Sequence, residues 1–195
     1  MSIHWSNEGS MPVRDLRCGK CNASTSCSRG YHGSEAGVSV SIYICHKCGT
    51  PNYFDVGGMQ IPGPAFGGSV DHISDSYVKA LYDEARRCTS ANSYTAAVMC
   101  CRKLLMNIAV SKGAKEGLHF IEYIEFLAKN NYIPPNSQGW IDHIRKKGNE
   151  ANHEIRLMTN EDAEELVEFL EMLLKFIYEF PERTKKRISP KSPQV

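Results

Sequence analysis

Two CxxC motifs constrain this chain more than any other feature of its sequence. The first runs from Cys18 to Cys21 and the second from Cys45 to Cys48, with residues 22–44 between them. Each motif forms a tight turn that aims two thiolates at one point, and two such turns complete the tetrahedral set of sulfur ligands that Zn²⁺ prefers. We therefore expect one zinc ion bound by Cys18, Cys21, Cys45 and Cys48.

A site closed by four cysteines leaves no coordination position for water or substrate, so we expect this zinc to be structural. Eight cysteines in a short secreted chain would instead indicate disulfides, but the first eleven residues are polar and contain no apolar signal-peptide core. Cys27, His32 and His46 are alternative ligands, although we interpret them as ordinary loop residues. The remaining cysteines are expected to be small buried residues of helices: Cys88, Cys100 and Cys101.

The sequence around the CxxC motifs has the pattern of a small β unit. Aliphatic residues occupy every second position of segment 38–44, which predicts a strand that leads directly into Cys45. Residues 52–55 can form a short partner strand. Segment 22–37 is rich in Ser, Gly and Asn and is expected to be a loop. Together these features predict a zinc ribbon over residues 1–56.

A segment rich in glycine and proline follows the ribbon. Residues 57–68 read GGMQIPGPAFGG, with five glycines and two prolines. This composition does not support a regular helix or a central strand. We therefore place a linker at residues 57–73.

Amphipathic helices are expected after the linker. The spacing of apolar residues predicts helices at about 75–90, 93–111, 118–130, 136–153 and 161–179. Wide apolar faces and short connections indicate an antiparallel helical bundle over residues 74–182. Residues 183–195 are basic and contain Ser and Pro, which predicts a disordered tail. The expected fold class is α+β: a small zinc ribbon followed by an all-α bundle of about five helices.

The balance of charges restricts the class of partner. The chain has 23 Lys and Arg against 22 Asp and Glu, so its formal net charge is +1. This excludes a broad basic surface, and any nucleic-acid binding must come from local patches. No apolar run is long enough to span a membrane. We expect a cytoplasmic protein without membrane contacts.

A polar ladder marks the fourth predicted helix. Arg145, Asn149 and His153 recur at every fourth position, beside an apolar stripe that includes Ile141 and Ile144. The ladder drifts away from the stripe, so His153 is expected to face solvent, a partner subunit or a substrate. The ladder is either a solvated polar face or a functional site.

Four segments of the helical part resemble a known family. They are 83–88 (DEARRC), 97–105 (AVMCCRKLL), 144–154 (IRKKGNEANHE) and 159–163 (TNEDA). On these motifs, residues 74–180 resemble a bacterial helical domain of unknown function related to the HEPN superfamily. Relatives of that family occur alone, after zinc-ribbon-like segments, and at the C-terminus of type I restriction motor subunits. The resemblance implies an HEPN-like bundle in a bacterial or phage defence setting.

The resemblance also suggests a catalytic site. HEPN proteins that cut RNA carry an Arg, usually a polar residue after it, and a His after four to six intervening residues. This pattern maps onto His153 and Asn149, but it leaves Gly148 at the position of the Arg. Arg145 lies one residue too far away, and the lysines at 146–147 do not make the planar bidentate phosphate contact of Arg. The candidate catalytic residues are His153, Asn149 and Arg145.

Three functions follow as hypotheses. The first is a zinc-binding two-domain module that binds nucleic acid or a protein partner. The second is a dimeric HEPN-type metal-independent ribonuclease that uses His153, and the third is an assembly protein with protein contacts only. We expect a homodimer, because the last two predicted helices carry more apolar surface than a small bundle hides. Candidate interface residues, unless they complete the core, are Trp140, Phe169, Phe176 and Tyr178.

Overall fold

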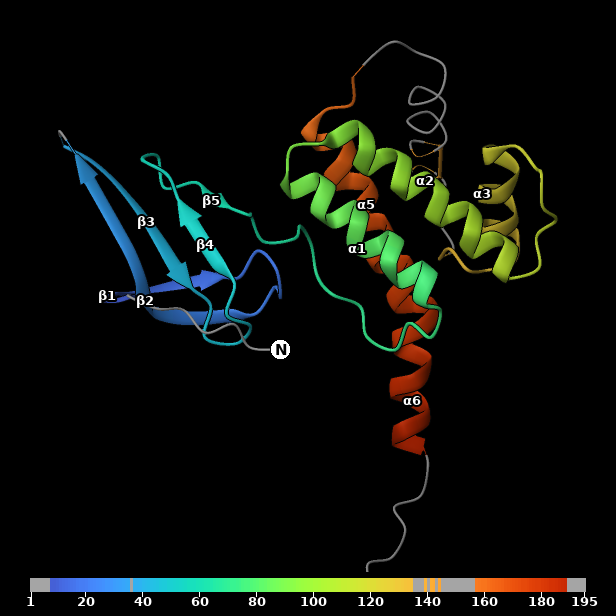
Figure 1. Cartoon of the computed structure of the whole chain (residues 1–195). Helices are drawn as coiled ribbons and strands as arrows, with labels where there is room; N and C mark the ends of the chain where they lie inside the picture. Colours follow the sequence, from blue (N-terminus) through green and yellow to red (C-terminus); the bar gives the residue numbers. More distant parts are fainter. Residues whose placement is uncertain are drawn as a thin grey trace, which may run out of the picture. The chain divides into compact units, whose positions relative to one another are not determined.

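The chain divides into two compact units, Met1–Ala65 and Phe66–Val195. A computed structural model describes residues 8–35, 37–134, 139, 141–142, 144 and 157–188. The first unit is a β-sheet and the second is helical (Figure 1). The division falls inside the segment that the sequence predicts as the linker. The α+β class expected from the sequence is confirmed.

The first unit is an antiparallel meander of five strands in the order β1-β2-β3-β4-β5. The strands are β1 (Gly9–Arg17), β2 (Ser24–Glu35), β3 (Val38–Ile44), β4 (Pro51–Phe54) and β5 (Gln60–Ile61). The predicted strand at 38–44 is confirmed, and β4 pairs with it as expected. The short β5 lies at the sheet edge within the predicted linker.

The prediction of a loop at 22–37 is wrong, because most of that segment is the long strand β2. At Gly30, an added Cβ would lie 1.8 Å from the backbone oxygen of Ile42 on β3. This glycine is therefore required by the close approach of the neighbouring strand and not by a turn.

The core of the sheet unit is small and surrounds the CxxC motifs. Its buried hydrophobic members are Leu16, Cys18, Cys27, Tyr43, Cys45 and Phe54. The rings of Tyr43 and Phe54 meet edge to face with centroids 5.8 Å apart. The guanidinium of Arg14 lies over the Phe54 ring at 3.7 Å. A core this small gives the fold little stability by itself.

The second unit is built from α1 (Ser76–Ser90), α2 (Tyr94–Ser111), α3 (Phe120–Lys129) and α5 (Asn160–Leu174). Helix α2 packs against the other three. Asp75 caps α1 by accepting hydrogen bonds from the backbone N–H groups of Tyr77 and Val78. Thr159 and Asp162 form a reciprocal capping box at the start of α5. These four helices match four of the five predicted ones.

The core of the helical unit is large, and α2 and α5 supply much of it. Leu104, Leu105 and Ile108 of α2 are fully buried, as are Phe169 and Leu170 of α5. Phe169, a candidate interface residue from the sequence, therefore belongs to the core. Burial of aliphatic side chains on this scale stabilises the helical unit without help from a metal.

A wide turn interrupts the last helix. After α5, residues Lys175–Glu179 form the π-helical turn η1, and α6 (Phe180–Ile188) continues the chain. Pro181 lies two residues after the wide turn and has no N–H to donate to the helical hydrogen bonds. The prediction of a disordered tail from residue 183 is wrong for residues 183–188, which are helical. Two charge pairs support the helix in this stretch: Glu182 with Lys185, and Glu179 with Arg183.

Segment 66–71 leads into α1 and is held by two helices. Arg86 of α1 donates to the backbone oxygens of Phe66 (2.7 Å) and Gly67 (2.9 Å). Glu171 of α5 accepts from the backbone N–H of Gly68 at 2.6 Å. Arg86, which belongs to the DEARRC segment, is 3% exposed and holds segment 66–71 against α1 through these bonds.

Candidate metal centre

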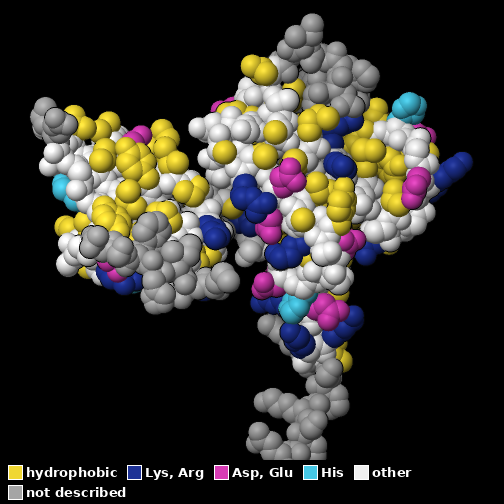
Figure 2. Space-filling view, viewed as in Figure 1, with side chains coloured by type: hydrophobic (Ala, Val, Ile, Leu, Met, Phe, Trp, Pro, Cys, Tyr) yellow, Lys and Arg dark blue, Asp and Glu magenta, His cyan; other side chains and the backbone are white. Residues whose placement is uncertain are grey.

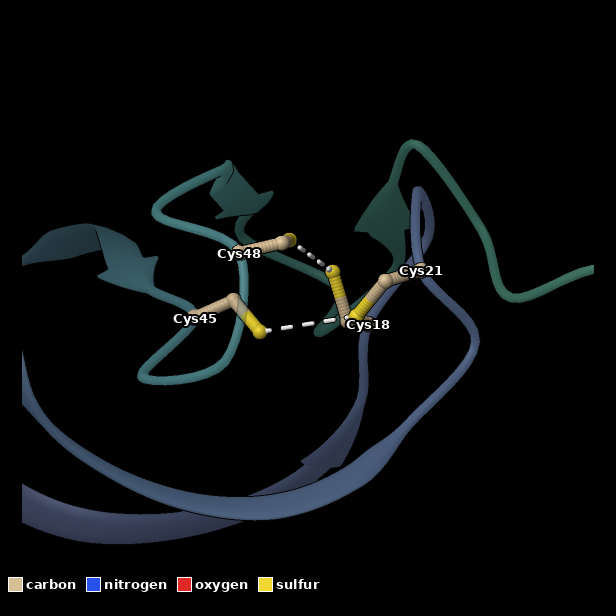
Figure 3. A group of neighbouring side chains, drawn as sticks. All are labelled: Cys18, Cys21, Cys45 and Cys48. Atoms are coloured by element: carbon tan, nitrogen blue, oxygen red, sulfur yellow. Dashed lines mark hydrogen bonds between the residues drawn. The ribbon is translucent and has the colours of Figure 1, made fainter. Parts of the chain in front are cut away.

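Four cysteine sulfurs from the two CxxC motifs converge at one end of the sheet. The Sγ atoms of Cys18, Cys21, Cys45 and Cys48 all lie within 4.8 Å of one another. Cys18 lies 3.7 Å from Cys48, and Cys21 lies 3.8 Å from Cys45, so each contact joins the two motifs (Figure 3). The structure thus brings together the four cysteines that the sequence predicts.

These distances fit a tetrahedral metal ion. A Zn–S bond of about 2.3 Å places the sulfurs of a regular tetrahedron about 3.8 Å apart. A disulfide would need sulfurs about 2.05 Å apart, and all four cysteines are free thiols. The donor set and its spacing therefore suit a closed thiolate site for one metal ion.

The two motifs have the same backbone geometry. In the first, the N–H of Asn22 donates to the oxygen of Cys18 at 2.8 Å, and in the second, that of Gly49 donates to Cys45 at 2.8 Å. The residue after each motif is left-handed, with φ 58° at Asn22 and 70° at Gly49. Asn and Gly are the residues that accept this conformation most easily. Both turns are therefore preformed by local sequence.

Asn52 of β4 connects the two turns from inside the protein. Its side chain is fully buried. The side-chain oxygen accepts from the backbone N–H of Gly19 at 2.9 Å, and the side-chain nitrogen donates to the oxygen of Thr50 at 3.0 Å. The same nitrogen lies 3.8 Å from the sulfur of Cys18. Asn52 thus orients both motifs and touches one candidate ligand.

Gln60 of β5 extends this network to the edge of the sheet. Its side-chain nitrogen donates to the Asn52 side chain at 3.0 Å and to the backbone oxygen of Arg17 at 2.8 Å. Gly19 is required on steric grounds, because an added Cβ would lie 2.0 Å from the oxygen of Pro62. The predicted linker therefore contributes residues that support the metal centre.

The thiols of the cluster differ in pKa. Burial acts to raise the pKa of Cys48, but hydrogen bonds with Thr50 and the other cysteines outweigh it and lower this pKa to about 6. For Cys45, burial dominates and raises the pKa to about 12. At neutral pH the cluster therefore holds a thiolate beside thiols, and metal binding must displace the remaining protons.

The alternative ligands from the sequence do not join the cluster. Cys27 is buried in the sheet core, and His32 and His46 are exposed.

In the helical unit, Cys101 is fully buried, and burial with Glu84 and Cys88 raises the pKa of Cys100 to about 11. A thiol that stays protonated at neutral pH is a poor nucleophile. Cys101 is thus the buried packing residue that the sequence predicts, whereas Cys88 and Cys100 are only partly buried.

The candidate catalytic residues His153, Asn149 and Arg145 lie outside the described residues, as does Trp140. Of the described neighbours, Ile141 and Ile144 are buried. The polar ladder therefore remains a prediction from the sequence.

Sequence reasoning missed Asn52 and Gln60. Their partners, Gly19 and Arg17, are far away in the chain and become neighbours only when the strands pair. The sequence contains one indication of the role of Asn52. It is a polar residue within the short strand after the second CxxC motif, and a polar side chain that is buried there needs hydrogen-bond partners.

The fold and the site define an α+β protein of two units. The first unit is a sheet with a candidate four-cysteine metal site, and the second unit consists of packed helices. The helical unit gives the family: residues 83–191 match the family described as Domain of unknown function (DUF4145), and the chain belongs to it. The sheet unit lies outside the matched range. No match was found among curated proteins or among solved structures. Within the described residues, no helix is long and apolar enough to cross a membrane.

Proposed function

We propose that the four-cysteine site binds one Zn²⁺ ion and that this ion is structural. The observation that supports it is the set of sulfur distances of 3.7 and 3.8 Å, which match the edge of a zinc–thiolate tetrahedron. Four thiolates fill the coordination sphere, so the ion would stabilise the sheet unit and would not activate water. Two of the six residues of the small sheet core are themselves ligands, so folding and metal binding are coupled.

We further propose that the protein is a binding module in a bacterial or phage defence or restriction setting, with a nucleic acid or a protein as its partner. The setting rests on the resemblance to HEPN-related proteins. The class of partner rests on the surface of the sheet unit, where hydrophobic side chains cover much of the visible face (Figure 2). Large apolar side chains that are more than half exposed there are Val13, Val56, Met59 and Ile61.

This surface favours a protein partner. Three of the basic side chains of the sheet unit already have contacts within it: Arg29 with Glu8 at 2.6 Å, Arg14 with Phe54, and Arg17 with the oxygen of Asn22. Few cations are left for phosphate contacts. Exposed aliphatic side chains gain free energy when a protein surface covers them.

A second candidate partner is a nucleic acid, and one observation favours it. Lys20 and Lys47 occupy the same position in the two CxxC motifs, and both are exposed. Both lysines belong to turns that hold ligands of the same site, so we propose that they present two cations beside the metal centre. A phosphate group is the natural partner of such a pair.

Two parallel measurements distinguish these partners. Fluorescence anisotropy of labelled single-stranded RNA and duplex DNA at low salt tests the nucleic acid, with Lys20→Ala/Lys47→Ala as the variant. Binding that weakens steeply with salt and is lost in this variant would assign a nucleic acid.

For a protein partner, affinity capture compares the wild type with Val13→Ser/Met59→Ser, and Leu157→Ser in the helical unit is the control. A protein lost only with the sheet variant supports the proposal, and equal capture by all three contradicts it.

The ribonuclease alternative depends on His153, Asn149 and Arg145 and stays a prediction from the resemblance. Incubation of zinc-loaded protein with single-stranded RNA tests it directly. Cleavage by the wild type that His153→Ala abolishes would support a catalytic function. Intact RNA in both samples would contradict it.

A further inference from the structure

An exposed apolar row runs along the end of the last helix. Its members are Met172, Phe176, Phe180, Thr184 and Ile188, and this set is called the apolar row below. Phe176 is 44% exposed, Phe180 is 49% exposed and Ile188 is 76% exposed. Helix α6 projects beyond the ends of α1 and α2 (Figure 1), and no other described helix covers it. Aromatic side chains in this setting are unusual on a monomer surface.

The wide turn keeps the apolar row on one side of the helix. Residues four apart on a regular α-helix drift steadily around its axis. The π turn at Lys175–Glu179 has more residues per turn and counteracts that drift. A hollow of about 670 Å³ is lined by Phe176, Phe180, Pro181, Thr184, Lys185 and Ile188. A second hollow of about 430 Å³ is lined by Glu168, Glu171, Met172, Lys175 and Phe180. An aromatic ridge thus separates two hollows.

The charges beside the apolar row divide along its length. At the α5 end, Glu168 and Glu171 line the hollow beside Met172, with Lys175 paired to Glu171, whereas α6 carries Arg183, Lys185 and Lys186 and one acidic residue, Glu182. One end of the row is therefore acidic and the other is basic. A second helix of the same kind matches this distribution only if it runs in the opposite direction.

We propose that a second copy of this chain covers the apolar row, with the two helices antiparallel. A two-fold axis that crosses the apolar row midway between Phe176 and Phe180 places Phe176 of each copy against Phe180 of the other. The same axis sets the acidic end of α5 opposite the basic α6 of the partner copy. The ridge of one copy then enters the hollows of the other, and the interface is self-complementary. This inference goes beyond the proposed binding function, because it assigns a surface for self-association in the helical unit.

The oligomeric state tests the surface. Sedimentation equilibrium of the full zinc-loaded chain should give the mass of two chains. Phe176→Ser/Phe180→Ser should give one chain, with at least about a tenfold higher Kd. Both side chains are half exposed, so their removal spares the core. The matched control is Met99→Ser on α2, which is 43% exposed and should stay dimeric. A monomeric wild type, or a dimeric Phe double variant, would overturn the proposal.

A charge swap tests the antiparallel arrangement. Glu168→Lys and Lys185→Glu should each be monomeric, because residue 168 lies within about one helical turn of residue 185 of the other copy, and each change brings like charges together there twice. An equimolar mixture of the two variants should form a heterodimer, because both contacts are then of opposite sign. Helical circular dichroism of each variant confirms its fold. Two dimeric single variants, or a mixture that stays monomeric, would overturn the arrangement.

Discussion

The side-chain oxygen of Asn52 accepts a hydrogen bond from the backbone N–H of Gly19 at 2.9 Å, across 33 positions of sequence. This bond joins the first cysteine turn to the strand that follows the second. Asn52 is fully buried, so its amide has no water to replace a lost partner. The relative position of the four sulfurs therefore depends on a residue that is not itself a ligand.

Asn52→Ala should weaken zinc binding while all four cysteines remain. The variant loses the bond to Gly19 and the contact with the sulfur of Cys18. Loss of such a supporting residue typically lowers metal affinity about 10- to 100-fold. Competition with a chromophoric chelator measures the affinity, and Asn107→Ala on α2 is the control. Unchanged affinity in Asn52→Ala would show that the sulfurs hold their positions without it.

Removal of the metal should unfold the sheet unit and spare the helical unit. The sheet core is small and contains two of the ligands, whereas the helical core has its own buried aliphatic residues. Two-dimensional amide NMR before and after treatment with a chelator should show loss of dispersed signals from residues 8–65 only. Cys18→Ser/Cys45→Ser should give the same spectrum. A spectrum that keeps the sheet signals would contradict coupled folding.

Cys27 provides a test that separates packing from ligation. Cys27→Ser places a hydroxyl in an apolar site and should cost about 1–3 kcal/mol of sheet stability. The zinc content should stay at one ion per chain, because Cys27 lies outside the sulfur cluster. Cys45→Ser is the comparison, in which zinc content falls. Loss of zinc in Cys27→Ser would make Cys27 a ligand.

The sequence predicts much of the fold where local pattern decides it. The alternation at 38–44 and the apolar spacing of the helix expected at 75–90 involve neighbours in the chain, and the structure confirms both elements. Strand β2 is not predicted, because Gly30 looks like a turn residue in the sequence. In the fold it is required by the close approach of the backbone oxygen of Ile42 on the next strand. Such a requirement depends on strand pairing, which the local pattern does not contain.

The same limit applies to the metal centre. The CxxC turns follow from local sequence, including the left-handed positions at Asn22 and Gly49. The supporting network of Asn52 and Gln60 depends on contacts between strands that only the folded sheet provides. The four cysteine ligands can therefore be predicted from the sequence, whereas the hydrogen-bonding residues Asn52 and Gln60 cannot.

Gly68→Ala should destabilise the helical unit. An added Cβ would lie 2.5 Å from a carboxylate oxygen of Glu171, which accepts the N–H of Gly68. The carboxylate must move, and the loss of its hydrogen bond from the N–H of Gly68 costs about 1.5–3 kcal/mol. Urea unfolding followed by circular dichroism at 222 nm measures the loss. Gly139→Ala is the control, because in the described structure a Cβ there meets no atom within 4 Å. Equal stability of both variants would show that Glu171 rearranges freely.

The stability of the helical unit should fall in acid, with Glu171 as one cause. Burial acts to raise the pKa of this carboxyl, but the bonds from Lys175 and from the N–H of Gly68 outweigh it and lower the pKa. A lowered pKa in the folded state gives stability that is present above the unfolded value, about 4.3, and is lost as the pH falls through the folded value.

Glu171→Gln should therefore be less stable than the wild type at pH 7, and the difference should shrink below about pH 4, since protonation then removes the same charge from the wild type. Urea unfolding at pH 7, 5, 4 and 3, at one protein concentration, measures this convergence. Glu116→Gln, which removes an exposed carboxyl between α2 and α3, should change stability little at any of these values. A Glu171→Gln deficit that stays constant across the series would mean that packing of the side chain, and not its charge, secures segment 66–71.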